Sequence, residues 1–291
     1  MTQPPENPAL AAALTVAASA FAAGTTLLAK ALGTGALGAP LNALQISQGR
    51  FLFAFIAISS VALVMRPSFT RPNLGLHVGR STLGWLGVTM MFAAAAFIPL
   101  SDATAISFLN PVFAMLFAIL FLGERIGPWR WGSAAIAMTG ALILMRPGAG
   151  TLQIGALIAL ASALFLGAEV ITIKLLSRKE APFQILLINN AVGLMISSIA
   201  ATFVWQAPTM AQWAALAGIG VLMASAQACF VNAMRMADAS FVSPFFYCAL
   251  AFAAFYDAAV FRVIPDGVSI AGATLILASA GILAWREARR V

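Results

Sequence analysis

The sequence predicts an all-α integral membrane protein with ten transmembrane helices, and three observations lead to this class. The 291 residues are 62% hydrophobic and only 9% charged, against roughly 25% charged residues in soluble domains, and the mean hydropathy is +0.97. The apolar residues form runs of about 20, each long enough to cross a hydrocarbon core of about 30 Å as a helix. These runs are continuous rather than alternating, which argues against a transmembrane barrel.

The expected helices follow one another with short connections, which leave no room for a soluble domain. The chain begins with MTQPPENPAL, which lacks the basic region and cleavage site of a signal peptide, so we expect the first helix to be retained. Turn-forming or charged residues separate the runs. The expected spans are 9–32, 41–65, 80–98, 103–122, 128–146, 153–175, 183–205, 211–231, 236–257 and 267–285.

Basic residues are distributed unevenly over the expected loops. With the N-terminus in the cytoplasm, twelve Lys and Arg residues, Arg80 among them, face the cytoplasm, Lys30, Arg146 and Arg262 face the other side, and Arg50 lies within a span. This is the positive-inside pattern of multi-pass membrane proteins. We therefore expect both termini in the cytoplasm, and we interpret the net charge of +7 as topology rather than as nucleic-acid binding.

The chain resembles itself at an offset of 133 residues. Positions 87–124 align without gaps with positions 220–257, and 11 of the 38 pairs are identical, which indicates an internal repeat. Five spans per copy is an odd number, so the second copy enters the membrane from the opposite side. We expect two inverted five-helix repeats, 1–147 and 151–291. Inverted repeats are a recurrent architecture of secondary transporters, which bind substrate near the membrane midplane.

Both copies contain a proline motif, SFLNPVF at 107–113 and SFVSPFF at 240–246. Proline removes a backbone donor, bends a helix and frees a carbonyl one turn earlier, so we predict Pro111 and Pro244 as helix-kink or gating positions. The polar and aromatic side chains around them are candidates for substrate binding, with the alternative that the hydroxyls only bond to their own helix. These candidates are Ser107, Phe108, Asn110, Ser240, Phe241, Ser243, Phe246 and Tyr247.

Ionisable side chains within spans are costly, and by default they face protein or water. Glu169, in the sixth span, is a candidate partner for a substrate ammonium group or a coupling proton, or for a structural pair with Arg50. Lys30 lies near a span end, where a long basic side chain reaches the interface. Gln227, as a deep polar group, and Met91, as an adaptable apolar one, complete the candidate substrate-binding set.

The chain offers little for catalysis. It has no phosphate-binding loop of the GxxxxGK[ST] type and no HExxH, GxSxG or CxxC motif. The single histidine, His77, is expected in a cytoplasmic loop, and Cys229 and Cys248 have no metal-ligand spacing. We therefore expect no enzymatic activity, no cofactor and no metal site.

The run FLNPVFAMLFAILFLGERIGPWRWGSAAIAMTGALIL at 108–144 resembles the EamA repeat of the drug/metabolite transporter superfamily. The residues that carry the resemblance are Pro111, Gly123, Glu124, Arg125, Gly132 and Gly140. The second copy departs from the pattern, because the GE dipeptide is absent and Asp257 aligns with Glu124. We expect that acidic residue to cap a helix or anchor a loop.

The resemblance implies a multi-pass secondary transporter or facilitator of the bacterial inner membrane that works by alternating access. Within the superfamily the chain looks most like the YddG-type aromatic amino-acid exporters. We expect export of small amphipathic metabolites, in the first place aromatic and other neutral amino acids, through a central cavity. The alternatives are multidrug or other metabolite efflux, and a non-transporting structural membrane subunit. The expected partners are the substrate and the lipid bilayer; the sequence leaves the oligomeric state open, and a monomer suffices.

Overall fold

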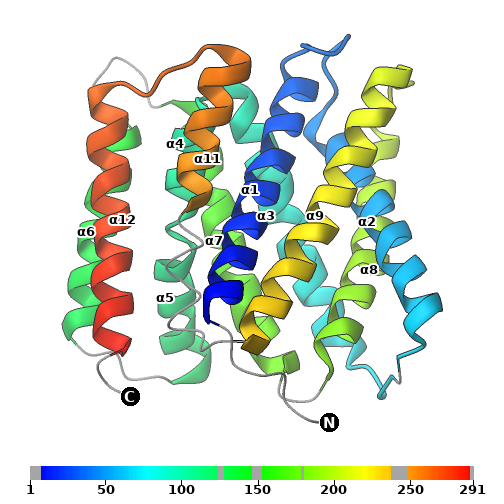
Figure 1. Cartoon of the computed structure of the whole chain (residues 1–291), viewed down its shortest axis with the longest axis horizontal. Coiled ribbons are helices and arrows are strands. Elements are labelled where there is room, and N and C mark those ends of the chain that lie inside the picture. The colour runs from blue at the N-terminus through cyan, green and yellow to red at the C-terminus, as the bar shows by residue number, and fades with distance from the viewer. Residues whose placement is uncertain are drawn as a thin grey trace.

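The computed structural model describes residues 8–67, 69–123, 128–145, 153–177, 180–236 and 248–288. In these ranges the chain contains helices and no strand. The helices stand side by side in one bundle, and α1 begins at the same end of the bundle at which α12 ends (Figure 1). We call this the terminal end, and the opposite one the distal end.

Most helices run through the bundle from one end to the other. Their bounds are α1 Pro8–Gly33, α2 Ala43–Met65, α3 Leu74–Phe97, α4 Leu100–Ser107, α5 Asn110–Leu122, α6 Pro128–Met145, α7 Ile154–Ser177, α8 Pro182–Thr202, α9 Met210–Met236, α11 Cys248–Tyr256 and α12 Gly267–Ala288, with a short π-helix, η2, at Asp257–Phe261. Six segments are long and apolar enough to cross a membrane, namely Ala9–Gly33, Ala43–Met65, Leu100–Phe121, Ile154–Ile173, Phe183–Thr202 and Met210–Phe230.

The prediction of an all-helical membrane protein is confirmed for the described part of the chain. The helix bounds follow the apolar runs closely where a run ends in turn-forming or polar residues, as α1 shows. The finer prediction of ten spans in two inverted repeats stays a prediction, since Trp131–Ile143, Cys248–Phe261 and Gly267–Ser279 are shorter apolar stretches. The second proline motif, with Pro244, lies outside the described residues.

The first proline motif divides two helices instead of bending one. α4 ends at Ser107, Phe108 and Leu109 follow as a turn, and α5 starts with Pro111 in its first turn. Proline fits there because the first helical N–H groups have no partner within the helix. The single fourth span expected from hydropathy is therefore two helices with a break between them.

α3 begins earlier than its apolar run suggests. The side chain of Asn73 caps it by accepting the N–H of Leu76, so His77 and Arg80 lie within the helix. Both side chains are buried. The expectation that His77 occupies a cytoplasmic loop was wrong, because its side chain is buried against Glu180, between α7 and α8. Arg80, expected as the first residue of its span, contacts Glu169 and the carbonyl of Ile185.

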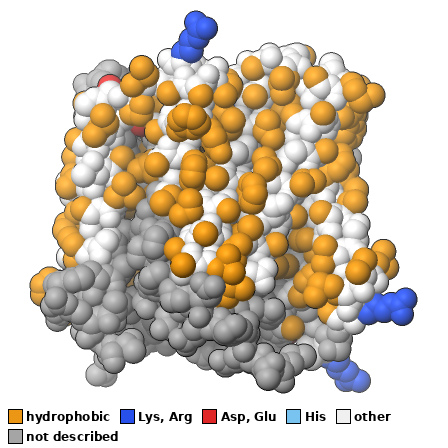
Figure 2. All heavy atoms as spheres, viewed as in Figure 1, with side chains coloured by type: hydrophobic (Ala, Val, Ile, Leu, Met, Phe, Trp, Pro, Cys, Tyr) orange, Lys and Arg blue, Asp and Glu red, His pale blue; other side chains and the backbone are white. Residues whose placement is uncertain are grey.

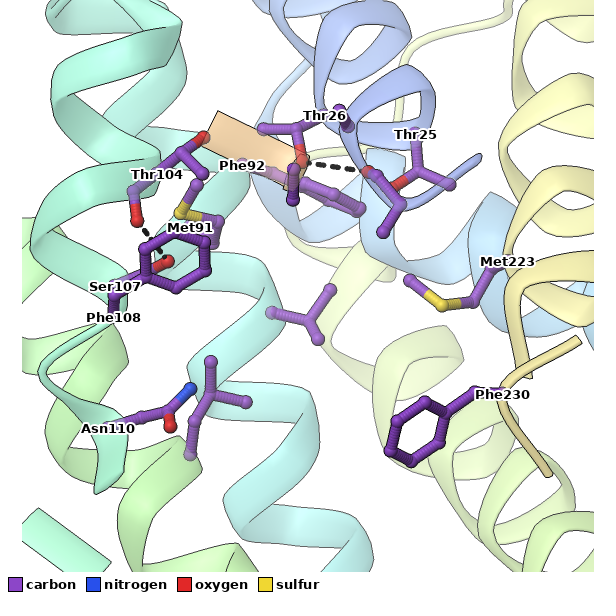
Figure 3. Close-up of a pocket in the computed structure, with 15 residues that line it drawn as sticks. Thr25, Thr26, Met91, Phe92, Thr104, Ser107, Phe108, Asn110, Met223 and Phe230 are labelled. Atoms are coloured by element: carbon purple, nitrogen blue, oxygen red, sulfur yellow. Dashed lines mark hydrogen bonds between the residues drawn. The ribbon is translucent and has the colours of Figure 1, made fainter. Parts of the chain in front are cut away.

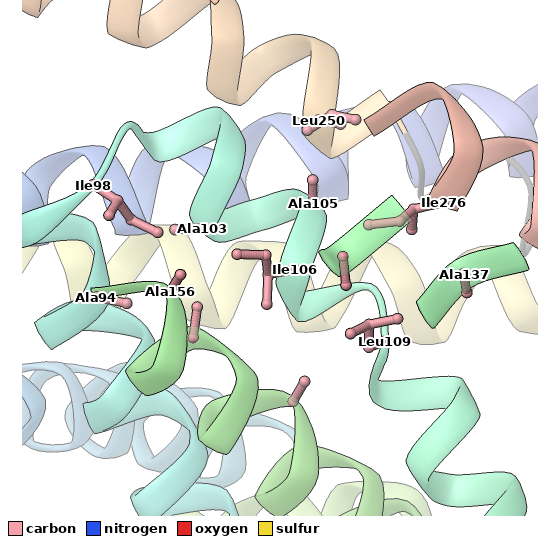
Figure 4. Close-up of a cluster of buried hydrophobic side chains, with 13 residues drawn as sticks. Ala94, Ile98, Ala103, Ala105, Ile106, Leu109, Ala137, Ala156, Leu250 and Ile276 are labelled. Carbon is pink, nitrogen blue, oxygen red and sulfur yellow. The ribbon is translucent and has the colours of Figure 1, made fainter. Parts of the chain in front are cut away.

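Close helix pairs form the interior. α1 packs along α9, α3 along α7, α2 along α8, and α6 along α12. One cluster of buried alanine, leucine and isoleucine side chains, to which Ile106, Leu109 and Ile276 belong, joins α3, α4, α6, α7, α11 and α12 (Figure 4). Small side chains let the helix axes approach, which is how helices associate where lipid offers no hydrophobic driving force.

The exterior of the bundle is apolar along its length. On the face shown in Figure 2, hydrophobic side chains cover the described helices, and the visible Lys and Arg side chains stand at the top and bottom edges. Leu63, Val64 and Phe203 are among the large exposed side chains. A lipid environment accommodates such a surface, and the distribution of charge matches it.

Gly220 in α9 marks a close helix contact that a small substitution can test. A Cβ atom at this position would lie 2.7 Å from the backbone N of Ala54 in α2, which cannot move aside as a flexible side chain can. We expect Gly220→Ala to lower the free energy of unfolding by about 1–3 kcal/mol through overpacking. The measurement is thermal unfolding of the purified protein in detergent.

The matched control is Gly281→Ala, because a Cβ at Gly281 in α12 meets nothing within 4 Å. This variant should unfold at or slightly above the wild-type temperature, since alanine is the better helix former. Equal unfolding temperatures of Gly220→Ala and wild type would contradict the close approach of α9 and α2.

Candidate functional site

A cavity of about 380 Å³ lies inside the bundle (Figure 3). This volume falls within the range of small-molecule sites, roughly 300–1,000 Å³. The lining residues come from α1, α3, α4, α5, α7, α9 and α11 and from the turn before α5. They are Ala22, Ala23, Thr25, Thr26, Val88, Met91, Phe92, Thr104, Ser107, Phe108, Asn110, Leu166, Met223, Phe230 and Ala249.

Aromatic rings and methionines form two facing walls of the cavity. Phe108 and Met91 stand on one side, and Met223 and Phe230 project from α9 on the other (Figure 3). Rings offer flat apolar surface, and thioethers adapt to varied shapes. The walls are therefore suited to a flat or bulky apolar group.

The polar groups of the cavity are neutral. The hydroxyls of Thr25 and Ser107 donate to the carbonyls of Ala22 and Thr104, both at 2.7 Å, so their oxygens remain acceptors. The amide of Asn110 has no hydrogen-bond partner among the residues that the structure describes. None of the described lining residues is charged. The cavity thus combines apolar walls with a few hydrogen-bonding groups.

The structure brings four predicted site residues together at the cavity: Met91, Ser107, Phe108 and Asn110. Two others do not line it. Gln227 lies in α9 with its side-chain oxygen buried and without a hydrogen bond in the described part of the chain, and Glu169 lies one turn beyond Leu166 on α7. The remaining predicted residues, Ser240, Phe241, Ser243, Pro244, Phe246 and Tyr247, fall outside the described residues.

The contribution of α1 to the cavity was missed from the sequence. Ala22, Ala23, Thr25 and Thr26 line it together. Alanines are ordinary packing residues, and threonines within spans usually bond to their own helix, so neither type stands out. The one available signal was the pair of adjacent threonines within an otherwise apolar run.

A buried ion pair closes the bundle toward the distal end. Nζ of Lys30 in α1 lies 2.5 Å from Oδ1 of Asp257 in η2, and it also lies 4.7 Å from the ring centre of Phe261. The second oxygen of Asp257 accepts the backbone N–H of Leu100, at the start of α4. The expectation that Lys30 reaches the interface was wrong, since it is 7% exposed and paired. Asp257 caps a helix, as expected, and also holds a cation.

The distal closure also has an apolar layer. Leu27, Leu100 and Tyr256 pack with Ala95 and Ala253 in one cluster, and the Tyr256 hydroxyl donates to a carbonyl of α1 at 3.4 Å. Leu27 follows directly on Thr26, which lines the cavity. This cluster and the ion pair therefore lie between the cavity and the distal end.

A second polar network, near the terminal end, joins the start of α3 to the segment before α8. Oε2 of Glu180 lies 2.7 Å from His77 Nε2 and accepts from Gln184 at 2.7 Å, while Oε1 accepts the N–H of Asn73 at 2.9 Å. Burial raises the pKa of the Glu180 carboxyl, but these hydrogen bonds outweigh burial and leave the pKa below its usual value. The carboxyl is therefore ionised at neutral pH.

A third group of charges lies among α2, α3 and α7. Oε1 of Glu169 is 3.6 Å from Nη2 of Arg80, whose Nη1 donates to the carbonyl of Ile185 at 3.3 Å. Arg50 is buried close enough for electrostatic interaction with both. The partner of Glu169 in the ion pair is thus Arg80. The sequence had suggested Arg50 instead.

Comparison with known proteins identifies one family. The model of the EamA-like transporter family matches residues 9–146 and 153–285. The riboflavin transporter of Rhizobium johnstonii is 35% identical over 222 residues, which cover 74% of this chain and 71% of that protein. The pseudopaline exporter CntI of Pseudomonas aeruginosa is 28% identical, covering 78% and 82%. The S-adenosylmethionine uptake transporter of Rickettsia bellii is 26% identical, covering 86% and 87%.

A solved crystal structure shares the fold. It superposes with a TM-score of 0.64 over 94% of this chain and 98% of the other, at 18% sequence identity. At this identity the likeness concerns the fold alone. The named relatives carry three different cargoes in two directions, so their names agree on small metabolites and not on one substrate.

Proposed function

The chain belongs to the EamA-like transporter family, and we propose that it is a secondary transporter that moves a small amphipathic metabolite through its internal cavity by alternating access. One observation carries the proposal: the cavity of about 380 Å³ with apolar, aromatic walls and neutral hydrogen-bonding groups. A site of this composition holds an apolar body and orients it by a few polar contacts. Transport requires no catalytic group.

The first candidate cargo is an aromatic or other neutral amino acid, and the direction is export. The side chain of the amino acid would lie between Phe108, Met91, Met223 and Phe230, and its polar end would meet Asn110. The proline motif of the second half, with its serines and phenylalanines, would complete the site as the first motif does.

The second candidate cargo is a neutral, flat metabolite of the riboflavin type. Two observations favour it: a relative with that printed name is 35% identical, and none of the described lining residues is charged. Multidrug efflux remains the broader alternative, because apolar walls of this kind accept many shapes.

Alternating access would be provided by two inverted repeats, 1–147 and 151–291. The helix contacts support this division, since α1 packs on α9 while α3 packs on α7, and α6 packs on α12. The second-half counterparts of α1, α3 and α6 are α7, α9 and α12. A two-fold axis between the halves would therefore exchange the α1–α9 contact with the α7–α3 contact and map the α6–α12 contact onto itself. Rocking of one half against the other would then expose the cavity to either side in turn.

The orientation follows from the charges and the ends of the chain. α1 begins and α12 ends at one end of the bundle (Figure 1), and the positive-inside distribution assigns that end to the cytoplasm of a bacterial inner membrane. In this orientation the Lys30–Asp257 pair would close the distal, periplasmic side.

The test is counterflow in liposomes that carry the purified protein. Labelled phenylalanine, leucine, lysine and riboflavin are offered outside, with and without an excess of the same unlabelled compound inside. We expect accumulation of phenylalanine and leucine, and none of lysine, only in preloaded liposomes. Accumulation of riboflavin alone would select the second candidate. No accumulation of any of the four by folded protein would overturn the proposal for these cargoes and favour drug efflux or a structural subunit.

A further inference from the structure

Three charged side chains form what we call the arginine cluster: the buried Arg50 in α2 and Arg80 in α3, and the partly buried Glu169 in α7. Arg50 and Arg80 are 4% and 5% exposed, and the side chain of Glu169 is 15% exposed. The carboxylate lies against bare backbone, because a Cβ at Gly84 of α3 would be 2.7 Å from its Oε1. The cluster therefore sits within the helix bundle and not on its surface.

The cluster holds two cations and one anion, unlike the buried Lys30–Asp257 pair, in which one cation faces one anion at 2.5 Å. In the arginine cluster the ion-pair distance is 3.6 Å, from Glu169 to Arg80. One positive charge is thus left without a matching anion, in surroundings where an unmatched charge is costly.

The guanidinium groups also have unused hydrogen-bond donors. The Nε atoms of Arg50 and Arg80 are buried and have no acceptor among the described residues. The contact of the Arg50 guanidinium that the structure shows is the ring of Phe51, with its Cζ 4.3 Å from the ring centre. Arginine is built to receive a carboxylate through two parallel hydrogen bonds. The cluster lacks one such acceptor.

The cluster adjoins the cavity. Leu166 lines the cavity and Glu169 follows one turn later on the same face of α7. On α3, Val88 lines the cavity and Gly84, against which the Glu169 carboxylate lies, is one turn earlier. One helical turn is about 5.4 Å, so the Glu169 carboxylate, with Arg80 3.6 Å from it, lies about one turn from the cavity wall.

We propose that Arg50, together with Arg80, binds the carboxylate of the transported metabolite, and that the cargo is therefore an aromatic or apolar carboxylic acid with one negative charge. This inference rests on the proposed function and narrows it. A single carboxylate neutralises the cluster, whereas a doubly charged phosphate would reverse its charge. Glu169 is a positioning residue that holds Arg80 and does not contact the cargo.

Matched ligands test the carboxylate directly on the wild-type protein. A compound that binds only the folded form raises the unfolding temperature. We expect L-phenylalanine and 3-phenylpropionate to stabilise the protein in detergent. L-phenylalaninol, which lacks the carboxylate, should need about tenfold or higher concentration, as expected for a lost hydrogen bond to a charged group. Equal stabilisation by all three, or stabilisation by riboflavin alone, would overturn the inference and leave the proposed function standing.

Substitutions then assign the interaction. In Arg50→Met the preference for the carboxylate should disappear, and in Arg50→Lys part of it should remain. The control is Arg66→Gln, which changes an exposed arginine of the same chain region and should leave the preference unchanged. Retention of the full preference in folded Arg50→Met would overturn the inference. If Arg50→Met does not fold, the ligand series on wild type and on Arg50→Lys decides.

Glu169→Gln separates the two roles of the acidic residue. A positioning role predicts that phenylalanine and phenylpropionate weaken together or stay unchanged. A direct contact with the ammonium group of the cargo predicts that phenylalanine alone weakens, because phenylpropionate has no ammonium group, and this result would overturn the role assigned here. Absence of binding and of counterflow for every probe with wild-type protein would instead refute the proposed function itself.

Discussion

Lys30→Met should lower the free energy of unfolding by about 3–5 kcal/mol, the usual cost of removing one partner of a buried ion pair. The variant leaves the Asp257 carboxylate fully buried with the Leu100 N–H as its remaining partner. The same change should weaken the closure of the distal end and alter transport. The measurements are thermal unfolding in detergent and the rate of counterflow.

The control for this prediction is the double variant Lys30→Met with Asp257→Asn. Asparagine keeps an oxygen that accepts the Leu100 N–H but carries no charge, so most of the lost stability should return. Arg66→Gln removes an exposed cation and should have no measurable effect, as is usual for surface charges. A single variant as stable as wild type, or a double variant no more stable than the single one, would contradict a charge-dependent closure.

Met223→Trp should reduce counterflow by about tenfold or more, because even small changes of volume in a substrate pocket alter rates by this order. Met223 projects into the cavity opposite Phe108 (Figure 3), and an indole in its place occupies the room of the cargo. The initial rate of counterflow of whichever cargo the wild type moves is the measurement, with the amount of folded protein in the liposomes determined in parallel.

Met195→Trp is the matched control, since Met195 in α8 is 66% exposed on the outside of the bundle. A tryptophan there meets lipid and should leave the rate unchanged. Wild-type transport by folded Met223→Trp would show that the cargo takes another route.

Hydropathy was sufficient to place the helices where the run of apolar residues is uninterrupted. The expected span 9–32 corresponds to α1, Pro8–Gly33. The bounds of such a helix follow from the length of its uninterrupted apolar run. α3 was mislocated at its start because His77 looks like a loop residue and Arg80 like the charged end of a span. Their partners, Glu180 and the carbonyl of Ile185, stand more than 100 positions away in the chain, and no local pattern reports such a pairing.

The cavity was predicted in part for a similar reason. The residues around the first proline motif, such as Asn110, stand out because polar groups next to a helix break within a membrane need hydrogen-bond partners in protein or in a cavity. The alanines and threonines of α1 carry no such mark, and their position on the cavity depends on how α1 packs along α9. The pairing of Lys30 with Asp257 was missed because a lysine near a helix end can also extend its ammonium group to the water interface, at little cost in free energy. The sequence does not distinguish this arrangement from a buried ion pair.

The Lys30–Asp257 pair also constrains how the protein is made. The two residues are 227 positions apart, and chains are synthesised from the N-terminus, so α1 enters the membrane long before its partner exists. In that interval the ammonium group of Lys30 has to stay at the water interface. Asp257 arrives with the last tenth or so of the chain, so the Lys30–Asp257 pair forms late in synthesis. A nascent chain that stops before Asp257 lacks the buried partner of Lys30.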